Sequence, residues 1–176
     1  MENNELVKLN LGCGNNILAG YINIDKIRLE GVDLVLDLEE HTLPLADNSV
    51  SEVICDHILE HINNFIPLME ELYRVCANKA VIHVFVPNFK YEAAFRDPTH
   101  VRFFTEHTFD YFSADNMYNY YTTARFKVLS TKFTRIHKIK RFRKSSILAI
   151  LPFKKIFNYF LFNIFTEIVF KLEVVK

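Results

Sequence analysis

The chain has 176 residues, half of them hydrophobic, and its 21 basic residues balance its 21 acidic residues, so the formal net charge is zero. This length and composition are typical of one globular domain, and they argue against a disordered chain and a globally basic nucleic-acid-binding protein. The three cysteines are widely spaced without a C-x-x-C pair, which argues against a disulfide framework and a cysteine zinc site.

Seven apolar runs bounded by turn residues are typical of β-strands, and they lie at residues 6–11, 21–25, 32–38, 50–56, 80–86, 126–136 and 167–175. Apolar residues at helical spacing predict a helix over 57–76, and a shorter helix is expected at 105–112 with Thr105 as its N-cap. Strands alternate with helices, so we predict a single α/β domain over 1–176 with a Rossmann-like, mainly parallel sheet. The last strand is expected to run antiparallel beside 126–136.

The first two connections are short for such a fold. Residues 12–20 and 26–31 provide nine and six residues, whereas a parallel crossover with a full helix needs about a dozen or more. We therefore predict that the first helix is reduced to a turn near 17–19 and that the second is absent.

A Gly-x-Gly turn, Gly12-Cys13-Gly14, follows the first strand. Glycine lets the backbone turn sharply and lets a ligand approach closely, and ligands of open α/β sheets bind at this end of the strands. The third glycine of the dinucleotide fingerprint is missing because position 16 is Asn, which disfavours NAD and FAD.

Two acids end the next two strands. Asp25 is placed to accept hydrogen bonds from ribose hydroxyls, and Asp37 with Leu38 is placed near a purine. Strands often end in Asp at ordinary turns, so either acid alone has a structural explanation. Both acids in register with the glycine turn favour a nucleoside ligand.

Four successive motifs lie within about residues 6–112, namely Leu-Asn-Leu-Gly-Cys-Gly at 9–14, Ile-Asn-Ile-Asp at 22–25, Leu-Pro-Leu-Ala-Asp-Asn-Ser-Val at 43–50 and Cys-Asp-His-Ile-Leu-Glu-His at 55–61. In these motifs the chain resembles the class I S-adenosylmethionine-dependent methyltransferases, most closely the small UbiE-like group often called type 11. The shortened early helices depart from the family pattern and leave the orientation of the adenosine open.

The resemblance implies S-adenosyl-L-methionine as the cofactor. The family's glycine turn packs against the methionine part, its acid after the second strand holds the ribose, and the pair after the third strand sits by the adenine. The residues after the fourth strand face the sulfonium. In this sequence the matching positions, in the same order, are Leu11, Gly12, Cys13 and Gly14; Asp25; Asp37 and Leu38; Asp56 and His57.

The segment from His57 to His61 also spells H-x-x-E-H, the inverted zinc-protease signature. In that interpretation two imidazoles one helical turn apart would hold zinc, with Glu60 as the base and a third ligand from downstream. This zinc-dependent hydrolase is the alternative function. The favoured interpretation assigns no metal ligand and treats His61 as packed or solvated.

A polar and aromatic loop follows the fifth strand. Within it His100 is a candidate general base for an acceptor hydroxyl or amine, and Arg102 with Arg96 is a candidate for binding a carboxylate or phosphate. The alternative is that Arg96, Asp97 and His100 pair with one another and staple the loop. Four aromatic residues are expected to wall the methyl-transfer site from water, namely Tyr91, Phe95, Phe103 and Phe104.

A basic run at 132–144 precedes an apolar stretch at 147–165, and we predict a basic and then apolar helical insertion at 136–166 between the last two strands. This pairing suits a helix on an anionic membrane surface, with contact through 138–165. The alternatives are a helix that packs on the sheet or in a homodimer, and a site for an anionic phospho-glycan or lipid intermediate. No uncharged run reaches the roughly 18 residues of a transmembrane helix, and residues 1–5 form no signal peptide, so we expect a cytoplasmic protein.

The sequence therefore predicts an S-adenosylmethionine-dependent methyltransferase that acts on a small, sugar- or lipid-linked acceptor. Zero net charge disfavours nucleic acid as the substrate. Besides the zinc hydrolase, a second alternative is a non-catalytic S-adenosylmethionine-binding module that kept the fold and lost the activity.

Overall fold

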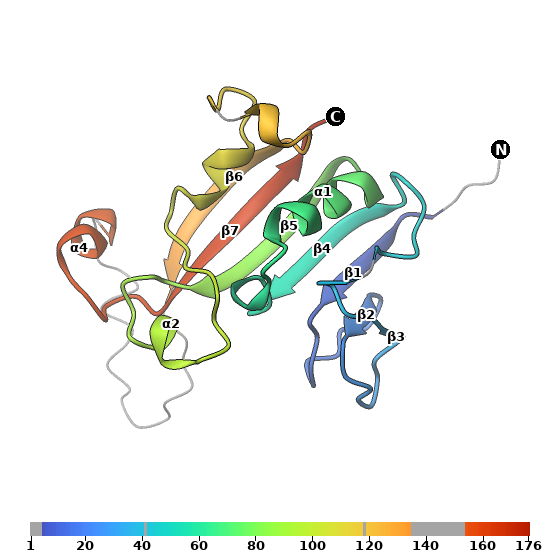
Figure 1. Cartoon of the computed structure of the whole chain (residues 1–176), viewed down its shortest axis with the longest axis horizontal. Helices are drawn as coiled ribbons and strands as arrows, with labels where there is room; N and C mark the ends of the chain where they lie inside the picture. Colours follow the sequence, from blue (N-terminus) through green and yellow to red (C-terminus); the bar gives the residue numbers. More distant parts are fainter. Residues whose placement is uncertain (1–4, 41, 118, 135–153) are drawn as a thin grey trace.

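A computed structural model of the chain describes residues 5–40, 42–117, 119–134 and 154–176. Within them one seven-stranded sheet has the order β3-β2-β1-β4-β5-β7-β6 (Figure 1). The strands are β1 Val7–Leu11, β2 Ile22–Asp25, β3 Leu34–Val35, β4 Val50–Asp56, β5 Cys76–Pro87, β6 Phe126–Thr134 and β7 Glu167–Val174. The pairs from β3 to β5 are parallel, and β7 runs antiparallel to both β5 and β6. The predicted α/β fold with an antiparallel C-terminal strand is confirmed.

Two predicted strands differ in length. The strand expected at 32–38 is reduced to β3 because the chain turns at Asp37, whose carboxylate accepts a hydrogen bond of 2.9 Å from the Glu39 amide. The strand expected at 80–86 begins earlier, at Cys76, directly after the preceding helix. The residues in between take up a register shift against β4, and Lys79 has a φ of +67° there.

The short early connections contain no helix, as predicted, within the described part of residues 12–49. A buried amide pair holds the first of them instead. The Asn10 side chain donates 2.9 Å to Asn23 Oδ1 and 2.8 Å to the Asn16 carbonyl, and the Leu18 amide donates 2.9 Å to Asn23 Oδ1. Buried amides need such partners. In this chain the Asn10–Asn23 pair therefore fixes the path of the first connection, which a helix would form in a full-length crossover.

The helix predicted over 57–76 is wrong as one element. The structure has a 3-10 turn, η1 (Leu59–His61), then an extended Ile62, then α1 (Phe65–Val75). His57 has a left-handed φ of +52°, which a continuous helix excludes.

The other helices are short: α2 (Ala93–Arg96), η2 (Thr108–Phe112), η3 (Asn119–Tyr121) and α4 (Lys154–Phe160). Thr105 was predicted to be the N-cap of a helix at 105–112, but η2 begins at Thr108 and Thr105 does not cap it. Its Oγ1 accepts 3.2 Å from the His107 amide and its own amide donates 2.9 Å to Thr108 Oγ1, so it closes the turn before η2. The basic run beyond Thr134 and the apolar residues up to 153 lie outside the described residues.

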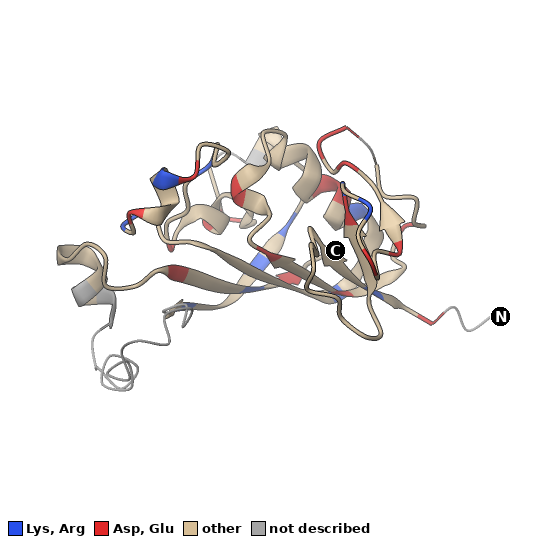
Figure 2. Ribbon diagram, turned by 90° about the horizontal axis from the view of Figure 1, so that it is seen from below, with Lys and Arg blue, Asp and Glu red and all other residues tan. Residues whose placement is uncertain are grey.

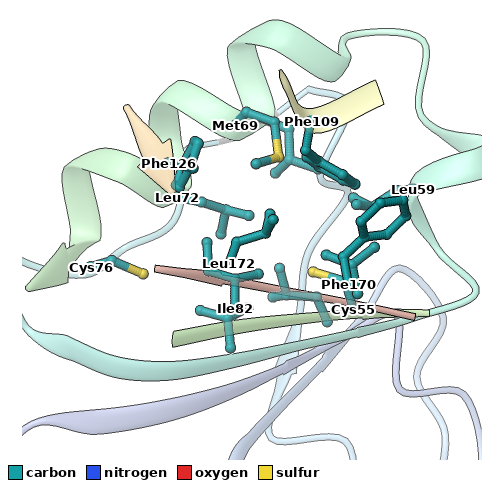
Figure 3. Packing of buried hydrophobic residues seen from close by; sticks show 14 of the residues in the cluster. Cys55, Leu59, Met69, Leu72, Cys76, Ile82, Phe109, Phe126, Phe170 and Leu172 are labelled. Carbon is teal, nitrogen blue, oxygen red and sulfur yellow. The ribbon is translucent and has the colours of Figure 1, made fainter. Parts of the chain in front are cut away.

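The main core lies between the sheet and the layer formed by α1 and η2, which cover the same side of the sheet (Figure 2). Met69 and Leu72 of α1 point toward Ile82 and Leu172 of the sheet (Figure 3). Phenylalanines fill the region between η2, α1 and β7, namely Phe65, Phe104, Phe109, Phe112 and Phe170. The three cysteines are buried and free, in agreement with the absence of a predicted disulfide framework.

Candidate functional site

A cavity of about 490 Å³ lies at the carboxyl ends of β1, β2 and β3. Its walls come from the glycine turn, the ends of two strands and the segment around η1. The lining residues are Gly12, Asp25, Lys26, Leu36, Asp37, Leu38, Glu39, His57, Ile58, His61, Ile62, Asn63 and Thr99. Five of the predicted cofactor-binding residues are therefore brought together here, namely Gly12, Asp25, Asp37, Leu38 and His57.

Four predicted cofactor residues do not line this cavity. Leu11 is fully buried in the core, and Cys13 is also buried, with the pKa of its thiol raised by burial. Gly14 contributes its backbone amide to the site, and Asp56 ends β4 beside His57, 4.0 Å between the carboxylate and the ring.

Gly12 requires glycine for two reasons. Its φ of +63° lies in the left-handed region, and a Cβ there would lie 2.7–2.8 Å from the Ile58 side chain. The turn therefore packs directly against the residue that precedes η1, and any side chain would force the two walls of the cavity apart.

Asp25 is held by the backbone on both sides. The Gly14 amide donates 2.8 Å to Oδ2, and the Ile27 amide donates 2.9 Å to Oδ1. Each carboxylate oxygen has a second lone pair, so the fixed carboxylate can still accept hydrogen bonds from a ligand in the cavity that it lines.

Glu39 is a wall residue that sequence reasoning missed. Its carboxylate accepts 2.9 Å from the Asn64 amide and also binds the amide of Asn63, at the start of α1. Burial opposes ionisation, but these hydrogen bonds outweigh it and lower the pKa of Glu39. A fixed anion at a helix N-terminus stabilises the helix, so Glu39 ties α1 to the cavity wall.

His57 lies between two carboxylates. Nδ1 is 3.0 Å from Glu60 Oε1, and Nε2 is 3.0 Å from Glu167 Oε1 on β7. Burial opposes the charge on the ring, yet the bonds to Glu167 and Glu60 prevail and raise the pKa of His57 to about 10. At neutral pH His57 is therefore an imidazolium with both N–H groups donated, and it is not a free base.

A second cavity, of about 570 Å³, also borders η1. It is lined by His57, Glu60, His61, Pro87, Tyr91, Ala93, Arg96, Asp97, Pro98, His100 and Thr166. His57 and His61 line both cavities, so the two cavities adjoin at these residues.

The two predicted catalytic residues separate. His100 lines the second cavity, and its Nδ1 donates 2.8 Å to the Ala94 carbonyl. Arg102 is not among the residues that line either cavity. Its guanidinium donates 3.1 Å to the Asn63 carbonyl and lies 4.8 Å from the centre of the Phe65 ring, and burial lowers its pKa. Arg102 thus anchors the loop to the start of α1.

The predicted aromatic wall is only partly in place. Tyr91 lines the second cavity. Phe95 and Phe103 stack on each other with ring centres 4.4 Å apart and are exposed, whereas Phe104 is fully buried in the core. The alternative in which Arg96, Asp97 and His100 pair with one another is met in part. Asp97 accepts hydrogen bonds from Thr99, and its carboxylate lies 3.9 Å from Nε2 of His100.

The helical H-x-x-E-H arrangement of a zinc hydrolase is not formed. The left-handed backbone at His57 prevents His57 and His61 from lying one turn apart on a helix, and both ring nitrogens of His57 bind carboxylates.

Of the described residues, none lies in a helix long and apolar enough to cross a membrane.

The methyltransferase domain family matches residues 22–84, from β2 into β5. This segment is similar to methyltransferase domains, in agreement with the resemblance seen in the sequence. The matched residues include Asp25, Asp37 and His57, whereas the glycine turn precedes them. No curated protein matches the chain by sequence.

Several solved methyltransferases have the same fold as this chain. A SAM-dependent methyltransferase from Archaeoglobus fulgidus superposes with a TM-score of 0.64 at 19% identity, covering 96% of this chain and 86% of that one. A methyltransferase from Mesorhizobium loti gives 0.59 at 10% identity, over 96% and 91%. A Burkholderia thailandensis 1,6-didemethyltoxoflavin-N1-methyltransferase, solved with bound 1,6-didemethyltoxoflavin and S-adenosylhomocysteine, gives a TM-score of 0.56 at 9% identity, covering 98% of this chain and 72% of that one. Together with the family match, they support S-adenosylmethionine as the cofactor.

Proposed function

We propose that the first cavity binds S-adenosylmethionine and that the chain transfers its methyl group to an acceptor in the second cavity. The supporting observation is the arrangement around Gly12 and Asp25. A turn that has no room for a side chain faces a carboxylate fixed by two backbone amides, with lone pairs left for a ribose. These features fit the methyl donor.

The bound donor supplies an activated methyl group, which leaves its sulfur as the acceptor's nucleophile forms the new bond. The protein's contribution is therefore positioning and exclusion of water. In our proposal Asp25 fixes the sugar, and Asp37 with Leu38 flanks the base. His57 and His61, which line both cavities, mark where the methyl group crosses.

His100 is the candidate proton acceptor in this scheme. Its Nδ1 is committed to the Ala94 carbonyl, which leaves Nε2 as the nitrogen available for a proton. We place no catalytic role on Arg102, because its guanidinium is bound to the Asn63 carbonyl and the Phe65 ring. We assign it the role of positioning the loop that carries His100.

We further propose that the acceptor is lipid-linked. The side chains of Tyr159, Phe160 and Phe162 are exposed by 73%, 73% and 67%, and they come from α4 and the residues after it. This segment is tied to the loop that carries Tyr91, because the Asn88 side chain binds Asn158 at 2.7 Å and the Lys90 side chain binds the Tyr159 carbonyl. An exposed aromatic cluster beside the acceptor cavity suits an apolar chain or membrane surface.

The experiment is methyl transfer from radiolabelled S-adenosylmethionine to cell extract, separated into organic and aqueous fractions. We expect enzyme-dependent label in the organic fraction, and none with the Asp25→Asn variant. Label confined to the aqueous fraction would contradict the lipid-linked acceptor. Absence of transfer by a chain that binds S-adenosylhomocysteine would instead indicate a binding module without activity.

A further inference from the structure

A cluster of potential metal ligands lies in the wall of the second cavity, and it includes His100, whose Nε2 can accept a proton as proposed above only while no metal ion is bound to it. Glu60, His61 and His100 each offer one ligand atom, and these three atoms lie within 4.8 Å of one another. Two of the residues come from η1, and the third comes from the loop after α2. All three line the cavity.

The carboxylate of Glu60 is only half used. Its side chain is 1% exposed, Oε1 binds His57 Nδ1 at 3.0 Å, and Oε2 is buried without a hydrogen-bond partner. A buried carboxylate oxygen without a partner is costly, and a bound cation removes that cost. Glu60 thus points to a ligand independently of the spacing of the cluster.

The two histidines are oriented as metal ligands usually are. His100 donates from Nδ1 to the Ala94 carbonyl at 2.8 Å, and Nδ1 of His61 lies 3.0 Å from Thr99 Oγ1 and 3.3 Å from its carbonyl. Histidine ligands typically use one ring nitrogen for such a contact, which fixes the tautomer and leaves the other nitrogen for the metal. Nε2 is that other nitrogen in both rings, and in His100 it lies 3.9 Å from Asp97 Oδ2.

We propose that Glu60, His61 and His100 bind a divalent transition-metal ion of the zinc class. Two imidazoles and one carboxylate match the preferred ligands of zinc, and three protein ligands leave a position open toward the cavity. Zinc bonds of about 2.0–2.2 Å place ligand atoms about 3.5 Å apart, so binding draws the cluster together. This site is not the H-x-x-E-H site, because His57 is held by Glu60 and Glu167 and the third ligand is His100.

The open position gives the ion a use. It faces the cavity assigned to the acceptor, where an acceptor oxygen or a water would complete the coordination, and this step alone rests on the proposed function.

The test is a titration of the purified full chain, stripped with a chelator, with Zn²⁺ by calorimetry and with Co²⁺ by visible absorption. No methyl donor or acceptor is present, so failure of the metal site and failure of methyl transfer are separate results. We expect one equivalent of either metal and a Co²⁺ ligand-field band. His100→Ala and Glu60→Gln are each expected to weaken binding at least about tenfold.

The matched control is His107→Ala, since this exposed histidine binds Asp110 outside the cluster and its loss is expected to leave the affinity unchanged. Thermal melting of each metal-free variant shows whether it is folded. Absence of stoichiometric binding to the wild-type chain overturns the proposal, whether or not the variants fold. Unchanged binding by folded His100→Ala overturns it too, and would point back to a ligand set within 57–61.

Discussion

At the scale of single residues, the site depends on groups with one available geometry. Gly12 is the clearest, because its φ of +63° and the nearby Ile58 both exclude a side chain. Gly20 has a similar φ of +81°, but nothing lies within 4 Å of its missing Cβ. Comparing a substitution at Gly12 with one at Gly20 therefore distinguishes the cost of steric overlap from the cost of backbone strain.

We predict that Gly12→Ala lowers the free energy of unfolding by about 3 kcal/mol or more, whereas Gly20→Ala costs about 1–2 kcal/mol for the left-handed backbone alone. Chemical denaturation measures both. Adding Ile58→Ala to Gly12→Ala should recover part of the loss. Equal losses for the two glycines would contradict the steric contact.

The charge on His57 has a consequence for stability. Its pKa is about 10 in the folded chain and about 6.5 when unfolded, so the folded chain binds the extra proton between these values. The stabilisation is complete below pH 6.5 and is lost as pH rises toward 10. We predict that the free energy of unfolding falls over this window, by at most about 1.4 kcal/mol per pH unit. In the His57→Gln variant the free energy of unfolding should depend less steeply on pH. A pH dependence identical to that of the wild type would contradict a charged His57 bound between Glu60 and Glu167.

At the scale of elements, α1 begins directly after two residues, Asn63 and Asn64, whose amides donate to the Glu39 carboxylate. The sequence does contain a signal for this boundary. Pro67 belongs in a first helical turn, and Asn63-Asn64 precedes it, so a helix starting near 64 is readable from these residues. The partner carboxylate, Glu39, is 24 residues from Asn63, and no local pattern connects them.

We predict that Glu39→Gln destabilises the chain by about 1 kcal/mol, because it removes the anion at the start of α1. Glu40→Gln is the matched control, since Glu40 is the next residue in the chain and its side chain is exposed. Thermal unfolding of both variants measures the difference. An equal effect of the two substitutions would show that Glu39 does not hold the helix.

The segment from α4 onward carries the proposed membrane-facing aromatics. Replacing Tyr159, Phe160 and Phe162 together with Ser should lower binding to vesicles that contain anionic lipid by at least about tenfold. Tyr120→Ser with Tyr121→Ser is the control, because these residues are 70% and 65% exposed but lie in η3. Sedimentation with vesicles measures both, and unchanged binding of the triple variant would exclude this segment as the contact.

At the scale of the whole molecule, the positions of the strands and of the glycine turn were predictable from the sequence, because buried strands and glycine turns are local patterns. The reduced early crossovers were also predictable, since their length alone excludes a full helix. The hydrogen bond between His57 and Glu167 could not be predicted, because 110 residues separate the two and only the antiparallel placement of β7 beside β5 brings them together. The grouping of Glu60, His61 and His100 depends likewise on the return of the loop after α2.

The central claim is that the first cavity binds the methyl donor through Asp25. Calorimetric titration with S-adenosylhomocysteine tests it most directly, using wild type, Asp25→Asn and the exposed control Asp115→Asn. We predict one site in the wild type, affinity at least about tenfold weaker in Asp25→Asn, and affinity within about twofold of wild type in Asp115→Asn. Absence of binding to the wild-type chain, or equal affinity of a folded Asp25→Asn variant, would contradict the account.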